Sequence, residues 1–261
     1  MSAKSALIFG HSHVWSIKRA IASKAYEPKT KGFVSEVILC GTREFPGPLI
    51  TRGLNGHLAL NACLIAELNK RASGAEKHEN EWLVSVVQGN FYNIIGLFQA
   101  NGPFDFVVPG AESLPLDAKA ALVPYGAIRA LIEDQASEMK QFLTYLTKLG
   151  HKHVAHINAP PPIESESFII EDLTEKKAFE GESAELTSAS TRLKLWMTQK
   201  AVVEAMCGEL GITCFNAPAS TLDELGFLKK EYWKDAVHAN EHYSAMVLKD
   251  LERVVMEGVA A

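Results

Sequence analysis

The sequence predicts an α/β protein with an open, mostly parallel sheet that carries helices on both faces. Two observations lead to this prediction. Short and almost continuously apolar runs recur along the chain and end at turn residues, as strands buried on both faces do. Segments with apolar residues at helical spacing lie between these runs, and this strand–helix alternation is typical of a three-layer α/β/α arrangement.

The expected strands are six apolar runs, each followed closely by Gly, Asn or Pro: residues 6–9, 36–40, 82–87, 104–108, 153–157 and 211–215. The expected helices are four segments with a period near 3.6 residues: 56–71, 124–149, 191–210 and 241–256. The alternation continues from end to end without an internal repeat or a linker. We therefore expect a single domain over residues 1–261.

Residues 159–188 interrupt this alternation. The stretch opens with Ala-Pro-Pro-Pro and continues with many acidic residues and no apolar face, which indicates a long surface loop with at most one short helix. Loops of this length in compact domains often border a binding site. A solvated excursion without a role is the alternative reading.

Composition limits the classes of function. Apolar residues make up 47% of the chain and charged residues 22%, as in soluble globular domains. The net charge of -5 and the scattered Lys and Arg residues argue against a nucleic-acid partner. No apolar stretch is long enough to span a membrane, and the first apolar run is too short for a signal peptide. We expect a cytoplasmic location with four free thiols, because none of the cysteines has C-x-x-C spacing: Cys40, Cys63, Cys207 and Cys214.

Polar residues that can carry chemistry follow several of the expected strands. Ser12 comes just after the first strand and Asn90 just after the third. Asp235 and His238 lie between the last expected strand and the C-terminal helix. Ligands of a parallel sheet bind beyond the carboxyl ends of its strands, so we expect these four side chains to meet at one edge.

Together these residue types indicate acyl-group chemistry. Serine becomes a nucleophile when a neutral imidazole takes its proton, and a carboxylate fixes the imidazole tautomer. Asp235 and His238 are close enough in sequence for that contact to form within a turn. The Ser12 N–H and the Asn90 side chain are candidate donors to an oxyanion. The alternatives are local roles: helix caps for Ser12 and Asp235, and a turn residue in the case of Asn90.

The motifs resemble the SGNH/GDSL hydrolase family. The first block of that family is a strand followed by Gly-Asp-Ser, and residues 8–12 match it with His11 in place of the aspartate. The last block is Asp-x-x-His ahead of a C-terminal helix, which residues 235–238 match. The two matches lie at opposite ends of the chain, so the resemblance spans its whole length.

The two middle blocks of the family are matched less well. The third block is Gly-x-Asn, and here Gln88 stands in the glycine position before Asn90, with Asn93 as a competing candidate. The glycine of the second block is either Gly53 or Gly56. These departures are compatible with a divergent enzyme and with a chain that has lost activity.

The resemblance implies a flavodoxin-like sheet of five parallel strands, no cofactor, and a hydrolase or acyltransferase acting on esters, often of acylated carbohydrates. It implies Ser12 as nucleophile, His238 as base and then acid, Asp235 as its orienting carboxylate and Asn90 as an oxyanion donor. The expected partner is a small-molecule or carbohydrate ester. We expect its further contacts to come from residues next to these motifs: His13, Tyr92 and Asn93.

A zinc-dependent amidohydrolase is a second candidate. His11 and His13 are spaced as zinc ligands at the end of a first strand, and Asp235 is in the place of a late aspartate ligand. Against this, about five strand–helix units are too few for an eight-fold barrel. His153 and His156 do not add a pair of ligands, because they project from opposite faces of one strand.

A non-catalytic carbohydrate-binding descendant of the same fold is a third candidate. Aromatic side chains and an arginine near the strand ends and on one helix are possible elements of a sugar groove, although such residues are more often part of a core: Trp15, Tyr92, Arg192 and Trp196. This candidate needs neither a nucleophile nor a metal.

Overall fold

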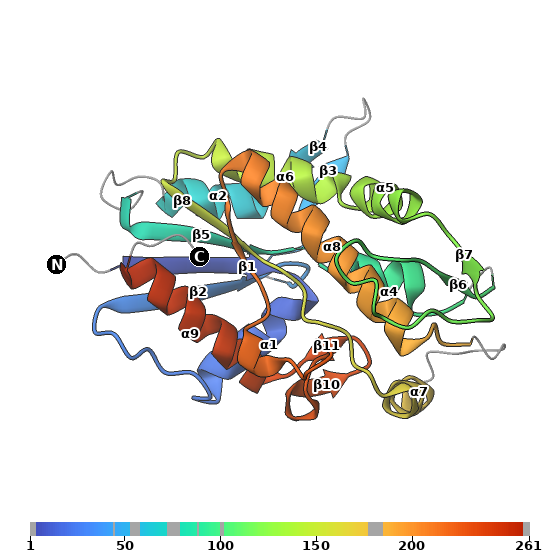
Figure 1. Cartoon of the computed structure of the whole chain (residues 1–261). Helices are drawn as coiled ribbons and strands as arrows, with labels where there is room; N and C mark the ends of the chain where they lie inside the picture. The colour runs from blue at the N-terminus through green and yellow to red at the C-terminus, as the bar shows by residue number, and fades with distance from the viewer. Residues whose placement is uncertain are drawn as a thin grey trace.

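The computed structural model describes residues 4–43, 45–52, 58–71, 79–87, 89–99, 102–176 and 185–257. Its centre is a five-stranded sheet in the order β2-β1-β5-β8-β9, in which every neighbouring pair is parallel (Figure 1). The strands are β1 (Lys4–Gly10), β2 (Phe33–Leu39), β5 (Glu81–Val86), β8 (His153–Ile157) and β9 (Thr213–Phe215). Counted within this sheet the order is 2-1-3-4-5, which is flavodoxin-like, so the predicted fold class is confirmed.

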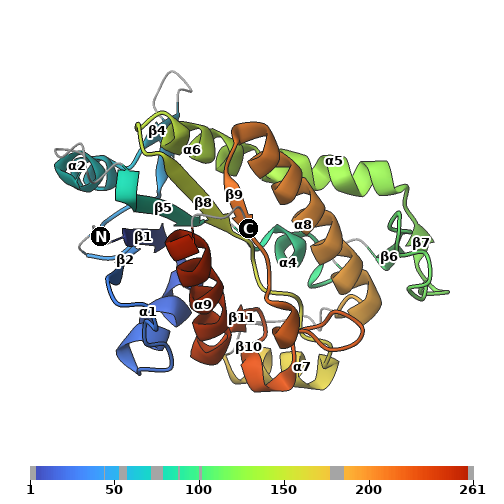
Figure 2. The ribbon, with the colours of Figure 1, turned by 60° about the vertical axis from the view of Figure 1, so that its left-hand side comes forward.

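Helices cover both faces of the sheet, which gives the three predicted layers (Figures 1 and 2). One face carries α1 (Ser12–Ala22) and α9 (Glu241–Glu257). The other carries α2 (Ala62–Arg71), α4 (Phe91–Gly96), α5 (Tyr125–Gln135), α6 (Ser137–Thr147) and α8 (Ala189–Leu210). Alternate residues of β1 enter the two cores: Leu7 and Phe9 point to the second face, and Ala6 and Ile8 to the first.

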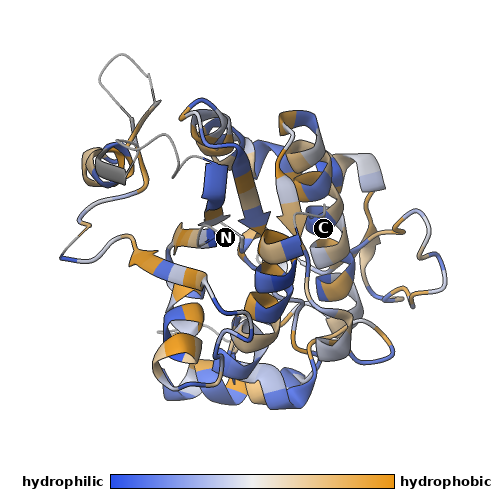
Figure 3. Ribbon diagram, turned by 90° about the vertical axis from the view of Figure 1, so that its left-hand side faces the viewer, coloured by the Kyte–Doolittle hydropathy of each residue, from blue (hydrophilic) through white to orange (hydrophobic). Residues whose placement is uncertain are grey.

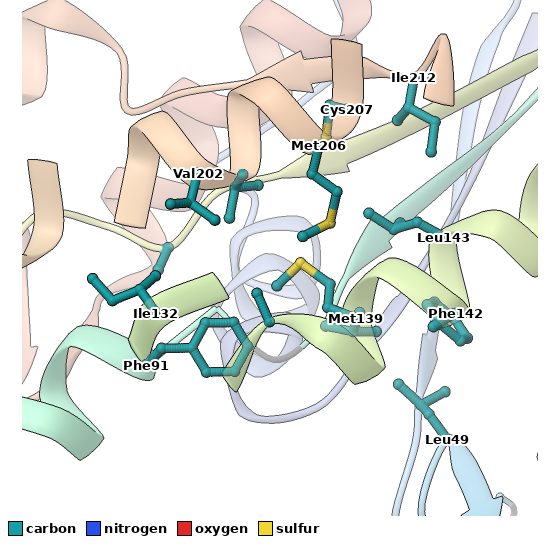
Figure 4. Packing of buried hydrophobic residues seen from close by; sticks show 14 of the residues in the cluster. Leu49, Phe91, Ile132, Met139, Phe142, Leu143, Val202, Met206, Cys207 and Ile212 are labelled. Atoms are coloured by element: carbon teal, nitrogen blue, oxygen red, sulfur yellow. The ribbon is translucent and has the colours of Figure 1, made fainter. Parts of the chain in front are cut away.

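The larger core lies between α4, α5, α6 and α8. Phe91, Ile132, Met139, Val202 and Met206 point toward one another from these four helices (Figure 4). The helices alternate between hydrophilic and hydrophobic stretches along their length (Figure 3), as expected for helices with one face against a core. Among the described residues, no helix is both long enough and apolar enough to cross a membrane.

The structure corrects the expectation for residues 104–108. Only Phe104–Asp105 forms a strand, β6, and it pairs with β7 (Ala121–Leu122) outside the central sheet. Phe106 and Val108 are buried in the larger core. The apolar run therefore reflects core packing without sheet pairing, a difference that hydrophobicity alone does not reveal.

Two of the expected helices begin or break at different places. The segment 56–71 starts with β4 (Leu58–Leu60), which pairs with β3 (Ile50–Arg52), and only then becomes α2. Asn61 separates strand and helix, because its side-chain oxygen accepts the N–H groups of Cys63 and Leu64. The segment 124–149 forms two helices, α5 and α6, with the break at Ala136. No Pro or Gly marks that break, so the sequence pattern continues through it.

Residues 159–188 are only partly the expected surface loop. Residues 159–163 are buried, and the helix α7 (Glu166–Glu175) follows them. The N-cap of α7 is Ser165, whose hydroxyl accepts the N–H of Phe168 at 3.3 Å. Ile169 of α7 packs with Leu97 and Ala236 in a small separate core. Phe168 and Leu173 of the same helix pack against this core, an apolar face that was not recognised among the acidic residues of the sequence.

Candidate active site

The turn between β1 and α1 presents Ser12. Gly10 ends the strand, and a Cβ at this position would lie 2.2 Å from the carbonyl oxygen of Val86, so only glycine fits. The N-cap of α1 is His11, and Ser12 is the first helical residue. The cap role considered for Ser12 is therefore wrong. Its side chain is exposed, and its hydroxyl makes no hydrogen bond within the described residues.

A cavity of about 580 Å³ opens at this turn. Its wall includes residues from the ends of β1 and β5 and from the junction of α5 and α6: His11, Ser12, His13, Val86, Gly89, Asn90, Phe91, Ile94, Asp134, Gln135, Ser137 and Glu138. The ends of β1 and β5 form the switch point where the strand order reverses, the usual ligand position in such sheets. The volume is typical of a small-molecule site.

Asn90 lies on the cavity wall at the N-terminus of α4. Its side-chain oxygen accepts a hydrogen bond from the amide of Asn93, so its own Nδ2 group is left to donate elsewhere. Gln199 on α8 fixes the loop: its Nε2 donates to the carbonyl of Gly89 at 2.6 Å, and its Oε1 accepts the N–H of Tyr92 at 2.8 Å. Gln199 was not predicted from the sequence, where its only distinguishing feature is that it is a polar residue within an otherwise apolar helical face.

Two residues expected beside the substrate lie elsewhere. Tyr92 is 2% exposed, and its hydroxyl donates to the carbonyl of Pro160 at 3.1 Å. Burial raises the pKa of Tyr92 well above its ordinary value, so it stays a neutral core residue. Asn93 is buried and orients Asn90. The corrected roles are packing for Tyr92 and positioning for Asn93, because both are on the inward side of α4.

The residues considered for a sugar groove are not gathered at the cavity. Arg192 and Trp196 are buried on α8. The Trp196 Nε1 donates to the carbonyl of Ala159 at 3.2 Å, and the Arg192 Nη2 donates to the carbonyl of Glu164 at 3.0 Å. Trp15 is exposed on α1 beside the Lys18 ammonium. These contacts do not assemble a groove.

Asp235 and His238 form a hydrogen-bonded pair in a short hairpin of β10 (Trp233–Asp235) and β11 (His238–Ala239). The Asp235 Oδ1 accepts the His238 Nδ1 at 2.8 Å, and it also accepts the N–H groups of Val237 and His238. Because Nδ1 donates to the carboxylate, Nε2 of the neutral ring is an acceptor. The predicted carboxylate–imidazole contact is present.

The surroundings keep Asp235 ionised. Burial alone would raise the pKa of Asp235, but the hydrogen bond and charge of His238, the N–H of Val237 and the charge of Lys176 hold it well below its ordinary value. The Lys176 Nζ is 3.6 Å from the Asp235 carboxylate. A permanent carboxylate is the state that a triad needs.

Helix α7 fixes this hairpin. Asp172 Oδ2 accepts the N–H of Ala236 at 2.9 Å, and its other oxygen is 2.8 Å from Lys176 Nζ. Lys176 therefore bridges Asp172 and Asp235. The sequence analysis missed both positioning residues; their signal was an Asp and a Lys four positions apart on the short helix of the 159–188 stretch.

His13, the residue directly after Ser12, contacts the hairpin. Its ring centroid is 5.0 Å from that of His238, with the planes tilted by 55°. Burial, and then the charge of His238, lowers the pKa of His13 to about 3, so the ring is neutral at physiological pH. No hydrogen bond of the described residues joins Ser12 to His238. The structure thus places the Asp–His pair against the ring of the residue that follows Ser12.

The residues of the zinc alternative do not form a metal site. In the described parts of the chain, no group of three or more His, Cys, Asp or Glu side chains is arranged to hold a metal ion. Burial lowers the pKa of His11, which keeps its ring neutral without a charged partner. The candidates Gly53, Gly56 and Gln88 lie outside the described residues. All four cysteines are free thiols.

Several solved structures are similar to this chain. They include a GDSL-like lipase from Bacteroides thetaiotaomicron (13% identity, TM-score 0.43, 98% of this chain and 89% of that one). Another is the periplasmic domain of a lipopolysaccharide acetyltransferase from Salmonella ser. Paratyphi A (10% identity, TM-score 0.49, 98% of this chain and 84% of that one). A third is a carbohydrate acetylesterase from Sinorhizobium meliloti (11% identity, TM-score 0.47, 98% of this chain and 100% of that one).

No protein-family model and no curated protein matches the chain. One of these similar structures is named a GDSL-like lipase, and the other two are named an acetyltransferase and an acetylesterase. Identities of 10–13% and TM-scores below 0.5 are too low to carry an activity to this chain. Its function is therefore argued from its own residues.

Proposed function

We propose that this protein is a serine hydrolase or acyltransferase that acts on a small-molecule or carbohydrate ester. One observation carries the proposal: the Asp235–His238 pair, hydrogen-bonded at 2.8 Å, contacts the ring of His13, which is the residue directly after the exposed Ser12. Ser12 in turn opens onto a cavity at the switch point of the sheet. A nucleophile, a base and a carboxylate are the parts that acyl transfer requires.

In the first half of the reaction, the Ser12 oxygen attacks the carbonyl carbon of the ester while its proton passes to His238 Nε2. Asp235 stabilises the imidazolium that results. The Ser12–His238 hydrogen bond forms when substrate binds, since catalytic hydrogen bonds commonly tighten only in the substrate complex. The oxyanion accepts hydrogen bonds from the Ser12 N–H, at the positive end of α1, and from Asn90 Nδ2.

The second half releases the product. The carbon–oxygen bond of the ester breaks, the alcohol leaves with the proton from His238, and an acyl group stays on Ser12. Water, or a hydroxyl of an acceptor, then gives its proton to His238 and attacks the acyl carbon. The acid or the new ester departs, and Ser12 recovers its proton. No bond in this sequence requires a cofactor.

The base in this proposal is His238 and not His13. His238 has a carboxylate on its Nδ1, which fixes the tautomer and stabilises the charged ring. Within the described residues no carboxylate is hydrogen-bonded to His13, and burial lowers the pKa of His13 to about 3, far below the pH at which a general base works best.

The test is covalent labelling with a fluorophosphonate together with hydrolysis of p-nitrophenyl acetate. We expect the label on Ser12 and a loss of kcat of about 10³-fold or more in Ser12→Ala, His238→Ala and Asp235→Asn. Ser137→Ala is the matched control, because Ser137 lines the same cavity and belongs to α6, away from the turn that carries Ser12. It should keep both the label and the turnover.

Other outcomes would replace the proposal. Turnover that persists in Ser12→Ala but disappears with a chelator would indicate a metallohydrolase. Absence of both label and turnover, with carbohydrate binding unchanged in Ser12→Ala, would indicate a binding protein.

A further inference from the structure

His13 occupies an unusual position next to the nucleophile. Its ring packs against His238 at 5.0 Å between ring centroids, and it is the residue directly after Ser12 in α1. A side chain at this point contacts the imidazole of His238 and is one residue away from the serine in the chain. What holds His13 in place is therefore important for the reaction.

A second, small cavity of about 20 Å³ is lined by residues of α1, β8 and α9, with His13 among them. Several of the residues that line it are polar: His13, Ser16, Asn158, Tyr243 and Ser244. One water molecule needs roughly 10–15 Å³ and two to four polar partners. The cavity therefore has the size and the lining of a site for a single water.

Two buried polar atoms of this lining have no hydrogen-bond partner among the described residues. They are the Nε2 of His13 and the hydroxyl of Tyr243. The serines beside them are satisfied, since Ser244 Oγ donates to Ser16 Oγ at 2.8 Å and Ser16 Oγ donates to the His13 carbonyl at 2.9 Å. An unsatisfied buried group is costly, so a bridging partner for these two atoms is strongly favoured.

We propose that this cavity binds one water molecule, which joins the His13 Nε2 to the Tyr243 hydroxyl and makes His13 a positioning residue for His238. The positioning role rests on the proposed function; the water site does not. The water fixes the tautomer and orientation of a neutral ring, and that ring is the surface against which His238 meets Ser12. Tyr243 acts on the reaction only through this water and His13.

The kinetic test is a double-mutant cycle on the full chain with p-nitrophenyl acetate. Tyr243→Phe removes only the hydroxyl, and we expect kcat to fall about fivefold with KM within twofold. His13→Leu should lower kcat at least as much, and adding Tyr243→Phe to it should cause no further loss, because the two residues act through one water. His13→Gln keeps a polar atom near the Nε2 position and should recover part of kcat.

Tyr26→Phe is the matched control. It also removes a buried tyrosine hydroxyl that contacts α9, in this case at Glu252 and away from the cavity. We expect it to lower stability and to leave kcat unchanged. Additive losses in the cycle, or an equal loss of kcat in Tyr26→Phe, would overturn the positioning role.

A readout without turnover separates this inference from the proposed function. In Ser12→Ala protein, the ¹⁵N resonances of the His13 ring should report one fixed tautomer, and the Nε2 shift should change in Tyr243→Phe but not in Tyr26→Phe. No change in Tyr243→Phe would reject the water site. If that change occurs in a chain that hydrolyses no ester, the water site holds while the enzymatic function and the positioning role fail.

Discussion

The two parts of the candidate site are held by different kinds of contact. The nucleophile turn, residues 10–13, is fixed by the main chain: Gly10 packs directly on the carbonyl of Val86, and its own carbonyl accepts the N–H of Cys40 at 2.8 Å. The Asp–His hairpin, residues 233–239, is held by side chains, because Asp172 accepts an N–H of the hairpin and Lys176 lies between two carboxylates.

This difference implies different sensitivities. The turn belongs to the central sheet, so a change that disturbs it should destabilise the whole fold. The hairpin depends on a few polar contacts from α7, so its position can change while the sheet stays intact. The ring of His13 in the turn contacts the ring of His238 in the hairpin.

The largest effect is expected from Gly10→Ala. The new methyl group would lie 2.2 Å from the carbonyl oxygen of Val86, a backbone atom that cannot move without separating β1 from β5. We expect a loss of about 3 kcal/mol in the free energy of unfolding, measured by urea denaturation. Gly126→Ala is the control: it is exposed in α5 with open space around its Cβ, and it should be neutral or slightly stabilising. Equal stability of the two variants would contradict the main-chain account of the turn.

A smaller effect, on activity more than on stability, is expected from Asp172→Ala. The variant removes the acceptor of the buried Ala236 N–H and one partner of Lys176, which releases the hairpin. We expect kcat/KM for p-nitrophenyl acetate to fall about tenfold and the free energy of unfolding to fall by about 1 kcal/mol. Glu171→Gln, at an exposed site on the same helix, should change neither. Unaltered kcat/KM in Asp172→Ala would show that α7 does not position the pair.

The smallest effect is a pH dependence confined to the hairpin. The folded-state pKa of Asp235 is depressed, so its carboxylate adds stability above the ordinary aspartate value of 3.8, and this stability is lost as the pH falls toward the folded value. Asp235→Asn lacks this contribution. We expect the wild type to be more stable than Asp235→Asn by about 1 kcal/mol at pH 7, with the gap narrowing below pH 4. The measurement is thermal denaturation of both proteins between pH 7 and pH 3. A stability difference that stays constant over this range would exclude the charge of Asp235 as the cause of the difference.

The sequence was a good guide wherever an element is defined by its own residues. Apolar runs identified all five strands of the central sheet, and the spacing of apolar residues located α8 and α9 to within a few positions. It misassigned residues 104–108, since an apolar run packed in a core looks like a buried strand. It also missed the break at Ala136, because both helices continue the same apolar pattern.

For the candidate site, the sequence by itself predicted the residues of the proposed chemistry: a serine after the first strand and an Asp-x-x-His pair whose spacing allows the hydrogen bond found at 2.8 Å. Only the tertiary structure decided that Ser12 is not a cap, that Tyr92 is in the core, and that Gln199, Asp172 and Lys176 hold the loops. The physical reason is the separation along the chain of the residues that make each contact. A bond between near neighbours follows from local spacing, whereas burial and contacts between distant residues depend on how the helices pack on the sheet.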